Sequence, residues 1–225
     1  MKKLTVVLSA VLCASLMTGC GLVNGNAGKP RYSYYPTEEQ LTQAAEVMSE
    51  DPCSGDIWVE GTVLTMPFQV KDFQAMGFNF DEKTLKRIDP FPANAEFLGG
   101  ELTRITGEEQ DLEQVIPVNL LSTLDREIPL GDVHTTSASF DRYDKMTLIM
   151  PKGISWGSTI EEVKAAYGEP VGGEDVYENE YYTRVSLSYS NDESRTSIRI
   201  SFEAEPDEEF KMTAISFIYS TTADN

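Results

Sequence analysis

The chain has 225 residues, a formal net charge of -19 and 40% hydrophobic residues. This acidity argues against nucleic acid as a partner, because such binding depends on cations that neutralise phosphates, and against adsorption to an anionic lipid surface. With one histidine and three cysteines, a multi-histidine metal site is excluded, and we expect no metal and no cofactor. The apolar content is enough for one sizeable core or two small ones.

The first twenty residues have the pattern of a secretion signal. Lys2 and Lys3 precede the apolar run Leu4–Leu16, which ends at Met17–Cys20. A charged start, a short apolar segment and small residues before the cleavage point are typical of a signal peptide, and this run is too short to cross about 30 Å of hydrocarbon. We therefore predict a signal peptide over residues 1–19.

The end of this segment resembles the lipobox of bacterial lipoproteins, in which one hydrophobic and two small residues precede a cysteine that takes a diacylglyceryl thioether. That cysteine would be Cys20, with Met17 in place of the usual leucine. The resemblance implies a protein held by lipid on the extracytoplasmic face of the cell membrane, where a two-chain lipid anchors stably without help from the protein surface. Loss of Lys2 and Lys3 would take the formal charge from -19 to -21. The alternative is an ordinary secreted protein with an incidental Cys20.

Residues 20–36 are predicted to be a flexible tether, because they are rich in glycine and polar residues and lack apolar periodicity. A helix should follow, since Thr37 and Gln40 have the spacing of a capping box. Its apolar face would be formed by Leu41, Ala44, Ala45 and Met48. Once Cys13 leaves with the signal and Cys20 carries lipid, Cys53 has no intramolecular partner, and its role, like that of His134, stays open.

A strand followed by a helix occurs twice along the chain. Val63–Pro67 is echoed 84 residues later by Leu148–Pro151, and each is followed by a short amphipathic segment that ends at a glycine. These segments are Val70–Met76 and Ile160–Tyr167. The pattern predicts a structural duplication, with chance similarity of two strand-helix units as the alternative. We expect an α+β fold of two tandem modules, residues 37–141 and 142–225, each with a short helix packed on an antiparallel sheet.

The second module has the clearest pattern. Ser158 and Glu161 have the spacing of a capping box, and Gly168 should end the helix. Three stretches then alternate apolar and polar residues: 185–190, 197–202 and 215–220. This alternation predicts an antiparallel sheet that is covered on one face only. Clustered carboxylates in the loops at 191–193 and 205–209 could hold calcium, but neither loop has the glycine-pivoted twelve-residue pattern.

This module resembles a known family. The matching residues are Gly157-Ser158-Thr159, Val163, Gly168-Glu169-Pro170, Tyr181-Tyr182 and the strands that end at Phe202 and Ile215. They are similar to the SmpA/OmlA small outer-membrane lipoproteins and to the related repeats of β-lactamase inhibitory protein. The resemblance spans roughly residues 148–218 and implies a binding or scaffolding module rather than an enzyme. The acidic, tethered chain is also similar to lipoproteins of Gram-positive gut bacteria.

One catalytic pattern is present, because Gly153–Gly157 matches the G-x-S-x-G of a nucleophile elbow, with Ser155 as the nucleophile. In those hydrolases the histidine follows the serine, whereas His134 precedes Ser155. The predicted sheet is also antiparallel, and the elbow belongs to parallel α/β sheets. We therefore expect no catalytic residues and no enzyme. The alternative interpretation of this pattern, a turn into a capped helix, is favoured.

The polar face of the predicted sheet is the candidate binding surface. Strand parity places the following residues together: Tyr182, Arg184, Ser186, Ser188, Ser197, Arg199, Ser201, Ser216 and Ile218. Short side chains let a partner approach closely, and tyrosine and arginine are frequent interface anchors. The same alternation would also arise in a face that is only solvated, or in one covered by the sheet of the first module.

Together these patterns predict a noncatalytic protein-binding or scaffolding lipoprotein with a protein partner in the cell envelope. The alternative is a receptor for a small solute or a glycan. Such a receptor usually encloses its ligand in a concave site, and the short length of this chain counts against two large lobes.

Overall fold

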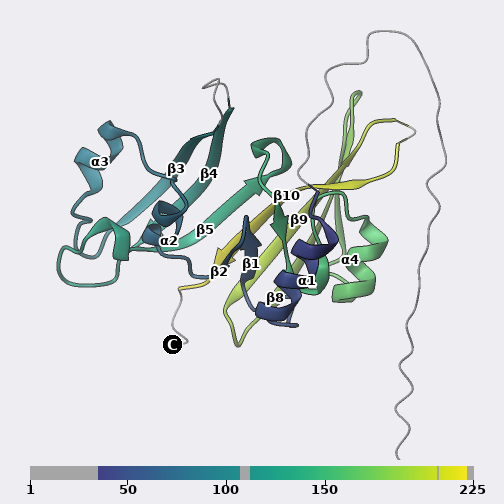
Figure 1. Ribbon diagram of the computed structural model, residues 1–225, viewed down its shortest axis with the longest axis horizontal. Helices are drawn as coiled ribbons and strands as arrows, with labels where there is room; N and C mark the ends of the chain where they lie inside the picture. Colours follow the sequence, from purple (N-terminus) through teal and green to yellow (C-terminus); the bar gives the residue numbers. More distant parts are fainter. Residues whose placement is uncertain (1–34, 107–111, 207, 222–225) are drawn as a thin grey trace, which may run out of the picture. The chain divides into compact units, whose positions relative to one another are not determined.

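The structure is a computed structural model that describes residues 35–106, 112–206 and 208–221. Its strands form two sheets in which every recorded pair is antiparallel (Figure 1). In spatial order, the seven-stranded sheet contains β3 (Glu96–Thr106), β4 (Leu112–Leu121), β5 (His134–Asp141), β10 (Lys211–Tyr219), β9 (Thr196–Ala204), β8 (Thr183–Asn191) and β7 (Glu174–Glu178). The smaller sheet contains β2 (Thr62–Thr65), β1 (Asp56–Val59) and β6 (Leu148–Ile149). The predicted α+β class is confirmed.

The large sheet consists of two meanders joined edge to edge. β3, β4 and β5 form the first and β7, β8, β9 and β10 the second, and the last strand of each pairs with the other along β5 and β10. A helix precedes each meander in sequence: α2 (Val70–Ala75) and then α3 (Glu82–Ile88) before the first, and α4 (Ile160–Tyr167) before the second.

The segments 37–141 and 142–225 interlock in two further ways. β6 of the later segment pairs with β1 of the earlier one, so the small sheet also contains strands from both. One continuous cluster of buried apolar residues includes side chains of α2, α4, the small sheet and the inner face of the large sheet. The two segments therefore contribute strands to one shared sheet, rather than forming two sheets that stack face to face.

Aromatic packing fills the core where the two meanders meet. The ring of Phe68 lies edge-to-face against Phe73 of α2, with centroids 5.6 Å apart, and against Phe217 of β10 at 5.7 Å. Phe140 of β5 makes the same contact with Phe217 at 6.2 Å. All four rings are at most 1% exposed. These contacts hold α2 and the strands β5 and β10 to one another, because each buried ring removes a large apolar area from water.

Two of the predicted helices begin where expected. The first, α1 (Glu38–Val47), ends before Met48, which was predicted on its apolar face, and Ala45 of that face is exposed. α1 follows Thr37, whose hydroxyl accepts from the Gln40 backbone at 3.3 Å while the Gln40 side chain accepts from the Thr37 backbone at 2.8 Å. α1 covers the outer side of the small sheet, where Ala44 packs with Trp58 and Ile149. The bounds of α4 are also confirmed.

The predicted cap of α4 is wrong by one residue. The capping box consists of Thr159 and Glu162 rather than Ser158 and Glu161. The hydroxyl of Ser158 instead accepts from the backbone of Ser155 at 3.2 Å and closes the preceding turn. No helix in the described part of the chain has the length and apolar character needed to cross a membrane.

Candidate functional site

The predicted polar face is a continuous outer surface of β8, β9 and β10. Ser186 of β8 lies opposite Ser201 of β9. Arg199 of β9 lies between Ser188 of β8 and Ser216 of β10. Ile218 of β10 lies opposite Ser197 of β9. Tyr182 immediately precedes β8, and the Arg184 guanidinium carbon lies 5.6 Å from its ring centre. We call this surface the hydroxyl face. Its members from the second module are Tyr182, Arg184, Ser186, Ser188, Ser197, Arg199, Ser201, Ser216 and Ile218.

The hydroxyl face extends further than the sequence analysis predicted. On one side it continues onto β5, where Ser139 lies opposite Ser216 and Ser137 lies opposite Ile218. On the other side it continues onto β7 with Asp175 and Tyr177. The alternation of Ser137 and Ser139 with buried Ala138 and Phe140 is visible in the sequence. What the sequence did not reveal is that β5 pairs with β10.

Hydroxyl groups on this face are paired across strands. The Oγ atoms of Ser186 and Ser201 lie 3.1 Å apart, and those of Ser139 and Ser216 lie 2.9 Å apart. Ser188 and Ser197 are exposed, and Ile218 is 52% exposed. Ser186, by contrast, is only 4% exposed, so it is not available to a partner. Because the paired hydroxyls already satisfy one another, a partner that covered the face would leave few hydrogen-bonding groups unpaired.

The two arginines of the hydroxyl face are each paired with a neighbouring carboxylate. Arg184 donates to a Glu203 oxygen at 2.5 Å from Nη2 and at 3.0 Å from Nε, and Arg199 forms an ion pair with Asp175. The hydrogen bond to Glu203 is also the main reason why the pKa of Arg184 is raised. Since Asp175 and Glu203 offset both cations, the face offers aligned polar groups rather than a positive potential.

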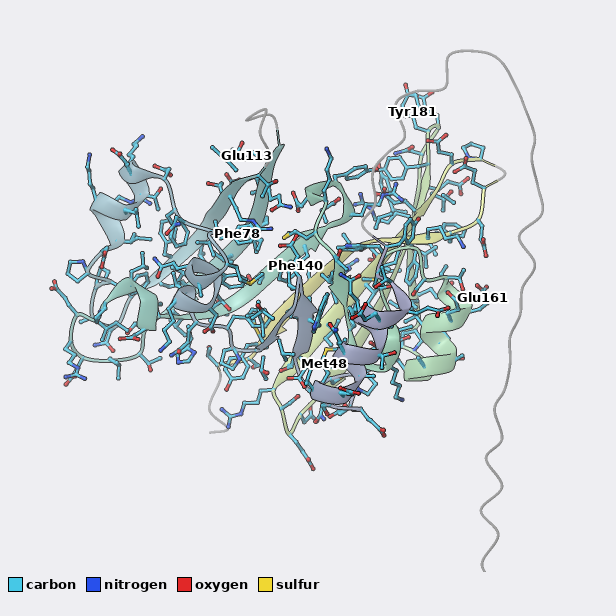
Figure 2. All side chains as sticks on the ribbon, viewed as in Figure 1. Met48, Phe78, Glu113, Phe140, Glu161 and Tyr181 are labelled. Carbon is cyan, nitrogen blue, oxygen red and sulfur yellow. The ribbon has the colours of Figure 1, made fainter. Side chains whose placement is uncertain are left out.

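One end of the hydroxyl face is aromatic. The rings of Tyr177 and Tyr182 lie 6.1 Å apart, next to the cation-π contact of Arg184. Tyr177 is 55% exposed, and Tyr181, at the tip of the hairpin between β7 and β8, is 71% exposed (Figure 2). Large exposed rings beside an arginine are the residue types that contribute most energy at protein interfaces.

Two cavities lie away from this face. The first, of about 390 Å³, is lined mainly by the turn after β4 and by the adjoining ends of β5 and β10, and it includes Leu121, Ile128 and His134. Both ring nitrogens of His134 are engaged, since Nδ1 lies 3.3 Å from the Pro67 carbonyl oxygen and Nε2 lies 3.3 Å from the Gln69 amide nitrogen.

The second cavity, of about 680 Å³, is lined by Cys53, by Tyr167 and Tyr189, and by several carboxylates. Burial, followed by the charge of Asp51, raises the pKa of the Cys53 thiol. Burial is also the main cause that raises the pKa of Tyr189 to about 12. Both shifts disfavour the anionic, more nucleophilic forms of these groups.

The G-x-S-x-G segment forms a turn. Ser155 is 8% exposed, and its backbone pairs with Ile149 in an isolated bridge. Among the described residues no hydrogen bond joins Ser155 to His134, which contacts Pro67 and Gln69 instead. In the same part of the chain no group of three or more His, Cys, Asp or Glu side chains is placed to hold a metal ion.

Cys20 and the predicted signal peptide lie outside the described residues, as does nearly all of the tether. Comparison of the chain with protein-family models, with curated proteins and with solved structures found no match.

Proposed function

We propose that this protein is a noncatalytic binding module that docks a protein of the cell envelope on its hydroxyl face. The observation that carries the proposal is the outer strand face with exposed Ser188 and Ser197 beside serines paired across strands, bordered by the exposed tyrosines and Arg184 at one end and by Ile218 on β10. Small-molecule sites are concave, whereas protein interfaces are broad and use tyrosine and arginine as anchors. The face has the second set of properties.

We further propose that lipid on Cys20 tethers the module outside the cytoplasmic membrane. The support is in the sequence, where the charged start, the apolar run and the Met17–Cys20 ending occur together. The net charge of the mature chain would be repelled by an anionic membrane. The lipid would therefore hold the module near the membrane while leaving the hydroxyl face available to a partner.

Site-specific photo-cross-linking in whole cells tests the docking surface. A photoreactive phenylalanine analogue at Ser197, which is exposed on the hydroxyl face, should form one dominant cross-link to an envelope protein. The control places the same group at Ser49, which is exposed after α1 on the far side of the small sheet. The same products from both positions, or none from Ser197, would contradict docking on this face.

A charge variant gives the second arm of the test. Ser188 and Ser197 are both exposed, so the double change Ser188→Glu and Ser197→Glu should fold normally and reduce capture of that partner at least tenfold. The matched control carries Gln43→Glu and Ser49→Glu, which add the same charge near α1. Undiminished capture by the face variant would refute the proposal.

The second candidate function is a receptor for a small solute or a glycan, and the 390 Å³ cavity beside His134 favours it. That volume falls within the range of small-ligand pockets, about 300 to 1,000 Å³. A metabolite or oligosaccharide that raises the melting temperature of the wild type and of the face variant equally would support this function instead.

A further inference from the structure

The two edges of the seven-stranded sheet are built differently. The register of β3 with β4 is interrupted between Phe97 and Gly100, and the outer side of β3 is bridged by Asn79, which exchanges two backbone hydrogen bonds of 2.9 Å with Thr103. β7 has neither feature. Its register with β8 is regular over its whole length, from Glu174 to Glu178.

The outer backbone of β7 has no partner among the described residues. In an antiparallel sheet alternate residues of an edge strand direct their N–H and C=O groups outward, and such an edge is a template for another strand. Natural edges are commonly protected by short length, charged side chains, proline or a bulge. β7 has no proline, lysine or bulge, and all five of its residues are exposed. Its three charged residues, Glu174, Asp175 and Glu178, are all acidic, so they repel an acidic strand but not a basic one.

The side chains of β7 define the strand that would fit beside it. Glu174, Val176 and Glu178 share one face, and Asp175 and Tyr177 share the other, which is continuous with the hydroxyl face. Val176 is 56% exposed between the two glutamates. A strand that placed an apolar residue opposite Val176 and a basic residue opposite Glu178 would make two favourable cross-strand pairs. A second basic residue opposite Glu174 would share that carboxylate with Lys164.

Charge also distinguishes between possible occupants. Lys164 of α4 contacts Glu174 at 2.5 Å, and Arg199 pairs with Asp175. Glu178 and the nearby Glu180, in contrast, have no cationic partner among the described residues. A second copy of this chain would place the same carboxylates beside one another, at a cost in free energy. The edge therefore favours a basic strand over self-association.

We propose that an extended segment of a partner protein, with the pattern basic-x-apolar-x-basic, adds to β7 as an eighth strand of the sheet. Main-chain hydrogen bonds would supply affinity and the alternate side chains specificity, as in other cases of strand addition. The inference depends on the backbone edge of β7 and not on the proposed function of the hydroxyl face.

A synthetic peptide tests the proposal with the complete mature chain. The probe is the acetylated and amidated peptide Thr-Lys-Thr-Val-Thr-Lys-Thr, and the control is the same peptide with its five central amides N-methylated, which keeps the charge but removes the donors. We expect saturable binding of the probe, at least tenfold weaker binding of the control, and at least tenfold slower hydrogen exchange at the outward-directed amides among residues 174–178. Equal binding of both peptides, or no added protection, would overturn the proposal.

A charge swap identifies the edge. Glu178→Lys should weaken binding of the probe by about fivefold, the size expected for one cross-strand charge pair, and a probe with glutamate for lysine at the facing position should restore it. Gln43→Glu on α1 is the surface control. Failure of the swap to restore binding, or a β7-dependent dimer in sedimentation, would refute the proposed occupant.

The Ser188→Glu and Ser197→Glu variant should retain peptide binding, because neither residue lies on β7. A failure of the proposed docking on the hydroxyl face is therefore distinguishable from a failure of strand addition to β7.

Discussion

The side chains of Ser139 and Ser216 meet across the boundary between the two halves of the chain. Their Oγ atoms lie 2.9 Å apart where β5 pairs with β10. Phe140 and Phe217, the next residues on the same strands, point to the opposite side and pack edge-to-face in the core. One strand pair thus joins the two meanders, contributes to the buried core and forms part of the hydroxyl face.

The two sides of this strand pair should respond very differently to truncation. Ser216→Ala should lower the free energy of unfolding by about 1 kcal/mol or less, because a solvent-accessible hydroxyl pair contributes little net energy. Phe217→Ala should lower it by about 3–5 kcal/mol, because it leaves a cavity among the core rings. Urea unfolding of both variants checks the difference, and similar losses would contradict the assigned faces.

The indole of Trp156 is expected to contribute a buried hydrogen bond in addition to packing. Trp156 is 2% exposed, and its Nε1 donates to the Met146 carbonyl oxygen at 2.6 Å. Trp156→Phe should therefore cost about 1–3 kcal/mol beyond the packing change, since it leaves a buried acceptor unpaired. The control is Trp58→Phe, because Trp58 is 4% exposed and its indole has no hydrogen bond among the described residues. Equal losses in urea unfolding would argue against the contribution of the bond.

Two half-buried carboxylates should lower the free energy of unfolding as the pH rises above about 3.8, because they are easier to bury when protonated. Burial raises the pKa of Asp141 and of Asp144 above 3.8. The folded state therefore binds protons more readily than the unfolded chain, and these groups lower stability as the pH rises from about 3.8 through the raised values. Asp141→Asn can still accept from the Tyr143 backbone, a bond of 2.8 Å in the wild type, and should flatten this decline.

The comparison with Asp81 checks the sign of that effect. Asp81 caps α3, and its hydrogen bonds with Thr84 lower its pKa. Its contribution is present above 3.8 and is lost as the pH falls through the lower folded value, so Asp81→Asn should weaken the acid-induced loss of stability instead. Unfolding curves recorded at several pH values would separate the two variants, and changes of the same sign in both would contradict the assignments.

Cys53 should be chemically quiet in the folded protein. It is 8% exposed, and burial followed by the charge of Asp51 raises its pKa. Because the thiolate is the reactive form, alkylation of a chain that begins at Gly21 should be at least tenfold slower in buffer than in urea. Equal rates in the two conditions would show that the thiol is accessible and ionised.

The lipid anchor predicts a clear outcome for Cys20→Ser. The variant should be released into the medium or remain unprocessed, because it lacks the thiol that takes the diacylglyceryl group. Mass spectrometry of the membrane fraction would measure both effects, with Cys53→Ser as the control that keeps the anchor. A variant with unchanged mass and membrane content would disprove lipidation at Cys20.

Local patterns in the sequence determined the elements that can be recognised from neighbouring residues alone. The bounds of α4, the Thr37 cap of α1 and the alternation along β8, β9 and β10 were all predictable, because helix and strand periodicity and capping depend on residues a few positions apart. The cap of α4 was predicted one residue too early because Ser158 and Thr159 both have a hydroxyl group. The hydroxyl of Ser158 accepts a hydrogen bond in the turn at Ser155, and Thr159 caps the helix.

Only the tertiary structure decided what surrounds these elements. The pairing of β5 with β10, of β6 with β1 and of Arg199 with Asp175 joins residues far apart in the sequence, and no short-range pattern specifies such contacts. They depend on which strands bury their apolar faces together. The serines were therefore foreseeable as a polar strand face. The neutralised arginines and the open edge of β7 follow from strand pairing within the second meander, and the extension onto β5 follows from the pairing of the two meanders.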